Sequence, residues 1–339
     1  MFPTVISSEW LIENINQQDI RIFDVSFFEN ETIEKAKHLF AKEHIKNSTQ
    51  LLLRGRDLSM QFFTKIPKAS TFTQLATQQG FSRGIHAILY DRDGRSAVRV
   101  WWLFQYFSHV RVSILQGGMT AWKAKNLPME ERKIAKLAEV PVTAFAAQPR
   151  PDLIVEPVEL AQFLASNKIL MPEELPQYLE SIRQYERVVD QKQILNQLDM
   201  VDIQGQVKKK AVFEQIIDAR SDQNKKLIPG SIQLNYELFY KDGMILTDIL
   251  RIKSIFRERM VTIDRPVLVV GDDGFDYSLI ALICFLYSGR GINGIQVLKG
   301  SISGFFDGQL EMSQSLAAQP GSMLRSTEDL NLSGSFKDQ

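Results

Sequence analysis

The feature that most constrains the fold of this 339-residue chain is a set of four short sequence patterns that each occur twice, in the same order. Each pattern marks a buried strand or the loop that follows one, and the pairs are 21–26 with 215–221, 44–48 with 227–231, 87–96 with 267–276, and 112–122 with 295–305. The copies are separated by 180 residues (Ala87 to Val267) to 194 residues (Arg21 to Gln215). Such self-similarity indicates repeated structural units, so we predict two domains of one design.

Within each copy, short apolar runs alternate with stretches of helical character. The runs 87–90 and 267–270 are each followed by a polar, glycine-bearing loop and then by an apolar stretch, 97–107 or 277–287, long enough for a helix. Continuous apolar runs joined by helices are typical of a parallel sheet buried on both faces. We therefore predict the α/β class, with two domains that each have a parallel sheet covered by helices on both faces.

The predicted boundaries follow from the repeat and from what lies between and after its copies. The predicted parts are an N-terminal domain, a helical linker or insert, a C-terminal domain and a flexible polar tail, at 1–147, 148–210, 211–310 and 311–339. The insert is longer than an ordinary connection, and 157–164 and 172–198 carry apolar residues near helical spacing. We expect it either to pack on the neighbouring domain or to form a docking surface for another chain.

Composition excludes several classes of partner and location. Lysine plus arginine equal aspartate plus glutamate, 40 against 40, so the chain lacks the basic excess that draws a protein to nucleic acid or an anionic membrane. No segment approaches the roughly 20 continuous apolar residues of a membrane span, and we expect no cleavable targeting signal at the N-terminus. The one cysteine rules out an intramolecular disulfide and fits a reducing compartment, either mitochondrial or cytoplasmic.

The repeated phrases resemble the tandem-domain rhodanese family, the thiosulfate and 3-mercaptopyruvate sulfurtransferases. In the first copy the resemblance is carried by 8–11, 24–26, 90–91, 99–102 and 115–122, and in the second copy by 218–221, 228–231, 266–267 and 300–301. The resemblance implies two rhodanese-like domains, of which the first is non-catalytic and the second carries the chemistry.

In that family, a cysteine at the end of the fourth strand of the second domain carries the transferred sulfur as a persulfide. Backbone N–H groups at a helix N-terminus stabilise its thiolate. When residues 266–270 are aligned with the family strand, Gly271 occupies the position of this cysteine. The loop then continues through Asp272, Asp273, Gly274, Phe275 and Asp276. The resemblance therefore implies a degenerate site that lacks its nucleophile, retains no catalytic residue and binds no cofactor.

Residues that bind substrate in the family also differ in this chain. Asp272, Asp273 and Asp276 concentrate negative charge where the family binds an anionic sulfur donor. Asn224 replaces an arginine that the family usually has after its Asp-Ala-Arg-Ser phrase, and Leu227 stands where histidine is usual. We expect the substrate-binding parts to have changed together with the nucleophile.

Three further constellations are open to a functional interpretation. Cys284 lies 13 residues beyond Gly271 in an apolar run, where we expect a buried core cysteine rather than a substitute nucleophile. Its spacing to Arg290 matches a phosphatase loop but comes too late in the helix. The carboxylates of 91–94 and 272–276 suit solvated turns better than cation sites. The four histidines, His38, His44, His86 and His109, are too scattered to predict a metal site.

The main hypothesis from sequence is an inactive sulfurtransferase homologue that serves as a structural or interaction subunit of a larger assembly. Its partners would be other protein subunits, bound through the 148–210 insert and the C-terminal tail. One alternative is an active thiosulfate or 3-mercaptopyruvate sulfurtransferase. Another is a sensor that binds a small anion or a cation in the retained crevice. Between the two compartments, the family resemblance favours the mitochondrion.

Overall fold

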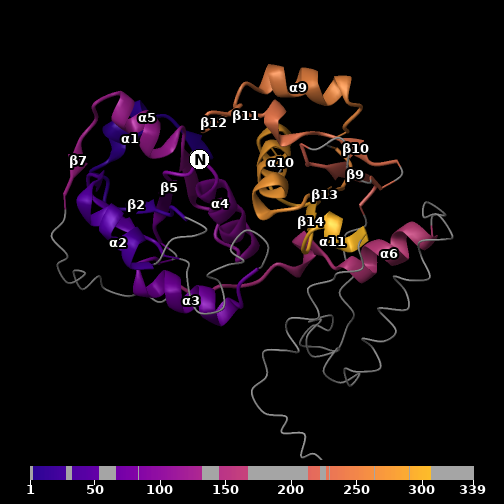
Figure 1. Ribbon diagram of the computed structural model, residues 1–339, viewed down its shortest axis with the longest axis horizontal. Coiled ribbons are helices and arrows are strands. Elements are labelled where there is room, and N and C mark those ends of the chain that lie inside the picture. The colour runs from indigo at the N-terminus through magenta and orange to yellow at the C-terminus, as the bar shows by residue number, and fades with distance from the viewer. Residues whose placement is uncertain are drawn as a thin grey trace, which may run out of the picture.

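The structure is a computed structural model that describes residues 3–27, 33–52, 66–82, 84–131, 145–166, 213–221, 227–228, 230–262, 264–289 and 291–306. Two parallel sheets, one in each half of the chain, have helices on both faces (Figure 1). This arrangement confirms the predicted α/β fold class.

The first domain is built on a five-stranded sheet with the order β1-β6-β5-β2-β4. Its strands are β1 (Val5–Ile6), β2 (Ile20–Asp24), β4 (Ser48–Gln50), β5 (His86–Tyr90) and β6 (Val112–Leu115). Its helices are α1 (Ser8–Asn14), α2 (Ile33–Lys42), α3 (Ala69–Gln78), α4 (Ser96–Tyr106) and α5 (Gly118–Ala124). A small antiparallel pair joins β3 (His44–Ile45) to β7 (Met129–Glu130).

The second domain repeats this plan, with the sheet order β10-β9-β13-β14-β8. Its strands are β8 (Ile154–Val155), β9 (Gln215–Asp218), β10 (Ile232–Gln233), β13 (Val267–Val270) and β14 (Ile295–Leu298). Its helices are η1 (Pro151–Leu153), α6 (Pro157–Ser166), η2 (Tyr236–Leu238), α9 (Ile249–Glu258), α10 (Gly274–Ser288) and α11 (Ile302–Phe306), and an antiparallel hairpin joins β11 (Tyr240–Lys241) to β12 (Met244–Ile245). The two sheets have the same order when read from β1 and from β8, as the repeat predicts.

The edge strand β8 corrects the predicted start of the second domain. Ile154 and Val155 pair in parallel with β14, as β1 pairs with β6 in the first domain. The second domain therefore begins near residue 151 rather than at 211, and residues 167–212 separate α6 from β9 instead of separating the domains. The helix predicted over 157–164 is confirmed by α6, whereas the one predicted over 172–198 and the tail at 311–339 lie outside the described residues.

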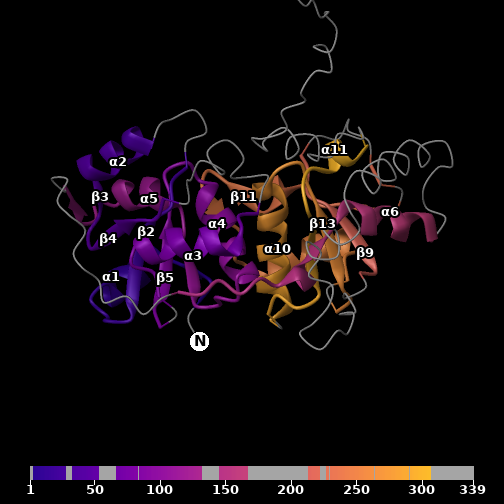
Figure 2. The ribbon, with the colours of Figure 1, turned by 90° about the horizontal axis from the view of Figure 1, so that it is seen from below.

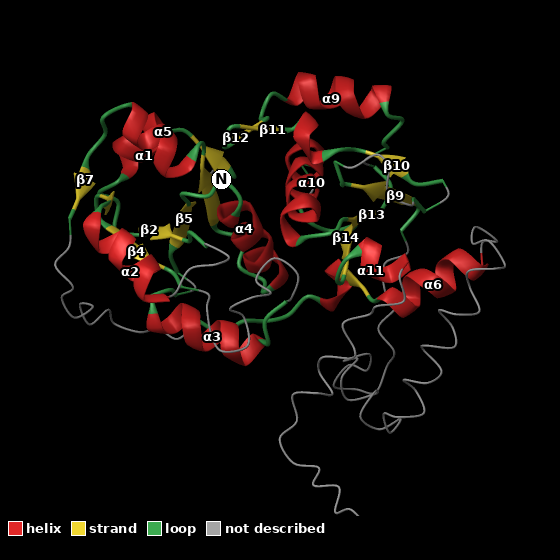
Figure 3. Cartoon of the chain, in the orientation of Figure 1, coloured by secondary structure: helices red, strands yellow, loops and turns green. Residues whose placement is uncertain are grey.

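Helices α4 and α10 join the two domains. Every residue of α4 from 96 to 105 and every residue of α10 from 274 to 284 is buried. A helix that is apolar all round needs cover on every side, and each of these two covers its own sheet and the other helix. Figures 1 to 3 show them side by side between the sheets.

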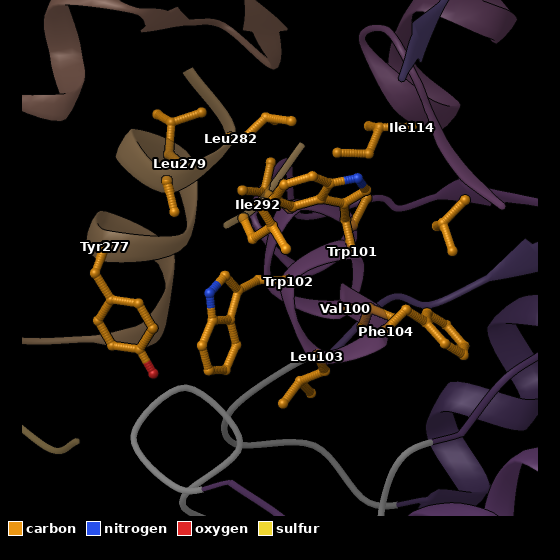
Figure 4. Close-up of a cluster of buried hydrophobic side chains, with 14 of the residues drawn as sticks. Val100, Trp101, Trp102, Leu103, Phe104, Ile114, Tyr277, Leu279, Leu282 and Ile292 are labelled. Atoms are coloured by element: carbon orange, nitrogen blue, oxygen red, sulfur yellow. The ribbon is translucent and has the colours of Figure 1, made fainter. Parts of the chain in front are cut away.

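Aromatic side chains fill the contact between α4 and α10. The ring centroids of Trp101 and Phe285 lie 5.4 Å apart, and those of Trp102 and Tyr277 lie 5.7 Å apart, both in edge-to-face geometry. Figure 4 shows Trp102 of α4 facing Tyr277 of α10. One apolar cluster thus runs from the first domain into the second, and both tryptophans belong to it.

A buried cation lies within this apolar contact. The Arg99 side chain is inaccessible to solvent, and its Nη1 donates a hydrogen bond to the Tyr277 hydroxyl at 2.6 Å. Its guanidinium carbon lies 5.2 Å from the ring centroids of both Trp102 and Tyr277. Burial lowers the pKa of Arg99, because removing water penalises the charged form. The Tyr277 hydroxyl and the two rings offset part of that cost.

We expect Tyr277→Phe to lower the free energy of unfolding by about 1.5–3 kcal/mol, because a buried guanidinium loses a hydrogen-bond acceptor. Denaturant unfolding measures the change. The matched control is Tyr287→Phe on the same helix, where the hydroxyl makes no hydrogen bond within the described part of the chain. Equal losses in the two variants would show that the Arg99 contact contributes nothing.

Candidate functional site

The loop that follows β13 is the one to which the sequence resemblance assigns the family's chemistry. Gly271 comes directly after the strand, and Asp273 is the N-cap of α10. The loop lies at the carboxyl end of the central strand, the usual ligand-binding edge of an open parallel sheet. The α10 N-terminus there offers backbone N–H groups that suit an anion.

The carboxylate of Asp273 occupies those N–H groups. Its Oδ1 accepts hydrogen bonds from the backbone nitrogens of Phe275 at 2.7 Å and Asp276 at 3.1 Å. Its Oδ2 forms an ion pair with Arg95, which belongs to the first domain. The helix N-terminus therefore already holds an anionic group that the chain supplies itself.

The neighbouring carboxylate of Asp272 ties the loop to α11. It accepts hydrogen bonds from the Ser301 hydroxyl at 3.0 Å and from the Ser303 backbone nitrogen and hydroxyl, both at 2.9 Å. The Arg220 guanidinium lies 3.9 Å away and is held by Asp218. These partners account for the negative charge that the sequence places in the loop.

The third carboxylate, Asp276, is buried beneath the loop. Burial and the nearby negative charge of Asp273 raise the pKa of Asp276 to about 7, because both disfavour the ionised form. Near neutral pH this side chain therefore carries less negative charge than an exposed aspartate. The predicted acidic loop is present, but two of its carboxylates have cationic or hydroxyl partners and the third is partly protonated.

Space at Gly271 is limited on the side where a side chain would project. A Cβ atom built there would lie 3.0 Å from the Asp276 Cβ and 3.3 Å from the Tyr277 backbone nitrogen. The Gly271 carbonyl accepts a hydrogen bond from Ile302 at 2.9 Å, which holds the backbone in place. A cysteine at this position would require Asp276 to move by a few tenths of an ångström.

The first domain fills the equivalent loop in the same way. Asp91 follows β5 as Gly271 follows β13, and its buried carboxylate accepts hydrogen bonds from the backbone nitrogens of Gly94 at 3.2 Å and Ala97 at 2.8 Å. Burial raises the pKa of Asp91. The Asp93 carboxylate accepts from the hydroxyl and the backbone nitrogen of Ser96. In both domains several backbone N–H groups of the loop are bonded to aspartate side chains of the same loop.

A cavity of about 550 Å³ lies between the domains beside these loops. Loop residues 91–95 form one wall, and residues 236–243 with Phe275 form another. The Arg95 guanidinium carbon lies 4.9 Å from the Phe275 ring centroid, so Arg95 both borders the cavity and neutralises Asp273. The cavity has room for a small polar ligand, and it opens onto the first-domain loop instead of onto Gly271.

The sole cysteine is remote from solvent. Cys284 is completely buried within α10, and burial raises the pKa of its thiol to about 12. The predicted core cysteine is confirmed. Arg290 and Asn224, the other positions singled out for chemistry, lie outside the described residues. Among the residues that the structure describes, no group of three or more His, Cys, Asp or Glu side chains is placed to hold a metal ion.

Sequence reasoning located the loop but missed its partners. Arg95 and Asp273 are 178 residues apart, and only the packing of the domains brings them together. Ser301 and Ser303 follow the repeated Leu-x-Gly phrase, which fixes their position near the loop but not their contact with Asp272.

Comparisons with known proteins find similarity to rhodanese-like sulfurtransferases. Residues 7–125 match the family model of the rhodanese-like domain. The chain aligns with 3-mercaptopyruvate sulfurtransferase of Mus musculus at 23% identity over 309 residues, which covers 89% of this chain and 91% of that protein. Thiosulfate sulfurtransferase of Rattus norvegicus aligns at 23% identity over 315 residues, covering 90% of this chain and 93% of the relative. Residues 7–125 thus match a rhodanese-like domain, and most of the chain is similar in sequence to the 3-mercaptopyruvate and thiosulfate sulfurtransferases.

Solved structures show that the chain has the two-domain rhodanese fold. A 3-mercaptopyruvate sulfurtransferase of Escherichia coli superposes with a TM-score of 0.61 at 19% identity, covering 89% of this chain and 100% of that one. The sub-stoichiometric sulfur transferase subunit of yeast mitochondrial complex I superposes with a TM-score of 0.64 at 15% identity, covering 90% and 96%. None of the described helices is long and apolar enough to span a membrane.

The raised pKa of Asp276 predicts a pH dependence of stability. With its pKa near 7 in the folded protein and about 3.9 in the unfolded chain, the folded state binds the proton more tightly. The free energy of unfolding should therefore fall as pH rises from about 4 to 7 and then level off. Asp276→Asn should lose this part of the dependence. Urea unfolding at a series of pH values tests it, and parallel curves for the two proteins would refute the assignment.

Proposed function

We propose that this protein is a catalytically inactive rhodanese-like homologue that serves as a structural subunit of a larger protein assembly. The observation that carries the proposal is the state of the loop after β13. Glycine stands where the resemblance places the persulfide cysteine, and the Asp273 carboxylate takes the N–H groups that would stabilise an anion.

Loss of sulfur transfer follows from the chemistry of the carrier. The nucleophile in persulfide formation is a thiolate, and Gly271 supplies none. Cys284 cannot replace it, because its thiol is buried and its high pKa keeps it protonated near neutral pH. An anionic donor would also approach a loop whose N–H groups are bonded to a carboxylate, which opposes binding by charge repulsion.

Retention of the scaffold supports a structural role. Both sheets, the buried α4–α10 contact and the Arg99–Tyr277 hydrogen bond are complete although the site is altered. The yeast structural neighbour is a subunit of mitochondrial complex I, which supports both the subunit role and a mitochondrial location. We retain the 148–210 insert and the C-terminal tail as proposed contact regions.

A second candidate function is ligand binding without turnover. The interdomain cavity of about 550 Å³ favours it, because Arg95, Tyr236 and Tyr240 border a space large enough for a small molecule. This candidate is compatible with a subunit role, since a cavity between domains can hold a ligand that stabilises the assembly.

We expect the purified protein to form thiocyanate from thiosulfate and cyanide no faster than the uncatalysed background. Cys284→Ser should leave that rate unchanged, because the thiol is enclosed in α10. A rate well above background that disappears in Cys284→Ser would support the alternative of an active sulfurtransferase.

Restoring the cysteine alone should not restore activity. In Gly271→Cys the Cβ of the new side chain would lie beside the Asp276 side chain and the Asp273 backbone carbonyl. Burial and nearby negative charge both raise a thiol pKa. We expect its alkylation by iodoacetamide to follow a pKa at or above the ordinary value of about 8.5. The matched variant Gly271→Cys with Asp273→Ala frees the α10 N–H groups and should react faster at neutral pH. Rapid alkylation of Gly271→Cys at neutral pH, with a thiol pKa well below about 8.5, would contradict this interpretation of the loop.

The subunit role is tested by the native size of the endogenous protein. Gentle lysis followed by native electrophoresis and mass spectrometry should place the 38.8 kDa chain in a defined assembly of much higher mass, with the same partner chains in replicate preparations. Migration near its own mass would overturn the proposed role and leave the ligand-binding function as the stronger candidate.

A further inference from the structure

Exposed large apolar side chains are concentrated on one segment of the second domain. Six such side chains occur among the described residues, and five of them come from one stretch of 23 positions: Leu238, Met244, Ile249, Leu250 and Met260. The sixth, Val110, lies in the first domain. Scattered exposed apolar residues are normal, whereas a concentration of them marks an interaction surface.

Helix α9 forms the core of this surface and runs along the outside of the second domain (Figure 1). Ile252, Ile255 and Phe256 face the protein and are buried. Leu250 and Met260 are 78% and 82% exposed. Leu250, Lys253 and Arg257 follow one another at intervals of three and four residues, the spacing at which a second helix packs against a helix. Met260 lies two residues beyond the end of α9.

The exposed side of α9 is strongly cationic. Between 249 and 259 there are four exposed basic residues, Arg251, Lys253, Arg257 and Arg259, and a single acidic one, Glu258. Glu258 accepts a hydrogen bond from Ser254, and within the described part of the chain no ion pair involves any of the four cations. This local excess contrasts with a net charge of zero for the whole chain.

A groove of about 310 Å³ lies beside α9. Phe256, Val261 and Tyr287 give it an apolar lining, and Lys253, Arg257 and Met260 border it. It can receive an apolar side chain from a partner while the two cations contact acidic groups next to that side chain. An apolar pocket within a charged rim is the usual anatomy of a protein-binding surface.

We propose that the stripe formed by Leu250, Lys253 and Arg257 of α9, with Met260 just beyond the helix end, binds an acidic amphipathic helix of a partner protein. The inference rests on the proposed subunit role and names the surface that serves it. The stripe has apolar residues at its two ends and cations at its centre. A complementary partner helix therefore has apolar residues at two positions and carboxylates between them. A membrane is a poorer occupant, because the apolar face of α9 is already buried against the domain and no wide apolar face remains for lipid.

Site-specific photo-cross-linking in the cells that make the protein tests this proposal. Leu250 in the full chain is replaced by p-benzoylphenylalanine, and the cross-linked peptide is identified by mass spectrometry. We expect one segment of another chain that is rich in Glu or Asp and has apolar residues at helical spacing. The same replacement at Val110, which is 71% exposed, is the control site and should give no such product.

A second experiment tests the contribution of the cations by reversing their charge. Lys253→Glu with Arg257→Glu should lower the yield at position 250 at least tenfold, whereas Lys37→Glu with Lys46→Glu, two exposed cations of the first domain, should leave it unchanged. Met260→Asn introduces a residue type that tolerates the positive φ of 58° at this position. A lower cross-linking yield at position 250 in this variant therefore reports a lost contact and not a strained backbone.

The remaining outcomes separate this proposal from the one on which it rests. Cross-links to lipid, to a second copy of this chain or to a segment without acidic residues would overturn the α9 assignment, and so would a yield insensitive to charge reversal. If the chain migrates in a large assembly but position 250 gives no product, the subunit role stands and this surface is refuted. If the chain migrates alone, both fail.

Discussion

The packing of α4 against α10 is the contact on which the rest of the structure depends. Each helix is the first after the central strand of its sheet, so their contact brings the two strand-end loops to the same interface. The Arg99–Tyr277 hydrogen bond lies within this contact, and the Arg95–Asp273 ion pair closes it at the loop end. A helix buried on every side cannot be removed without exposing the core of both domains. The two-domain arrangement is thus fixed by the core and does not require a working site.

The packing of that core does not depend on which group binds the N-terminus of α10. An N-terminus of a helix favours negative charge whatever its source. Here the source is the protein, since Asp273 caps α10 and Asp91 fills the equivalent loop of the first domain. Both domains therefore use the same device to satisfy their loop N–H groups. This symmetry explains how the fold can persist without a bound anion.

The sequence was most informative where the signal is local. Continuous apolar runs predicted β5 and β13, and the apolar stretches after them predicted α4 and α10, because such patterns depend only on neighbouring residues. The start of the second domain was missed because β8 has only two residues, too few to show a period. The partners of the acidic loop were missed for a different reason. Arg95 reaches Asp273 only through tertiary packing, and no local pattern encodes a contact between residues 178 positions apart.

We propose that the loop after β13 does not bind the anionic sulfur donors of rhodanese-like enzymes. Calorimetric titration of the purified protein with thiosulfate, and then with 3-mercaptopyruvate, tests this proposal. We expect no saturable heat up to about 10 mM ligand, which corresponds to a binding free energy weaker than about −3 kcal/mol. Saturable binding at micromolar concentration that is lost when Ser301 and Ser303 are both replaced by alanine would contradict it, because the loop would then still hold an anionic substrate.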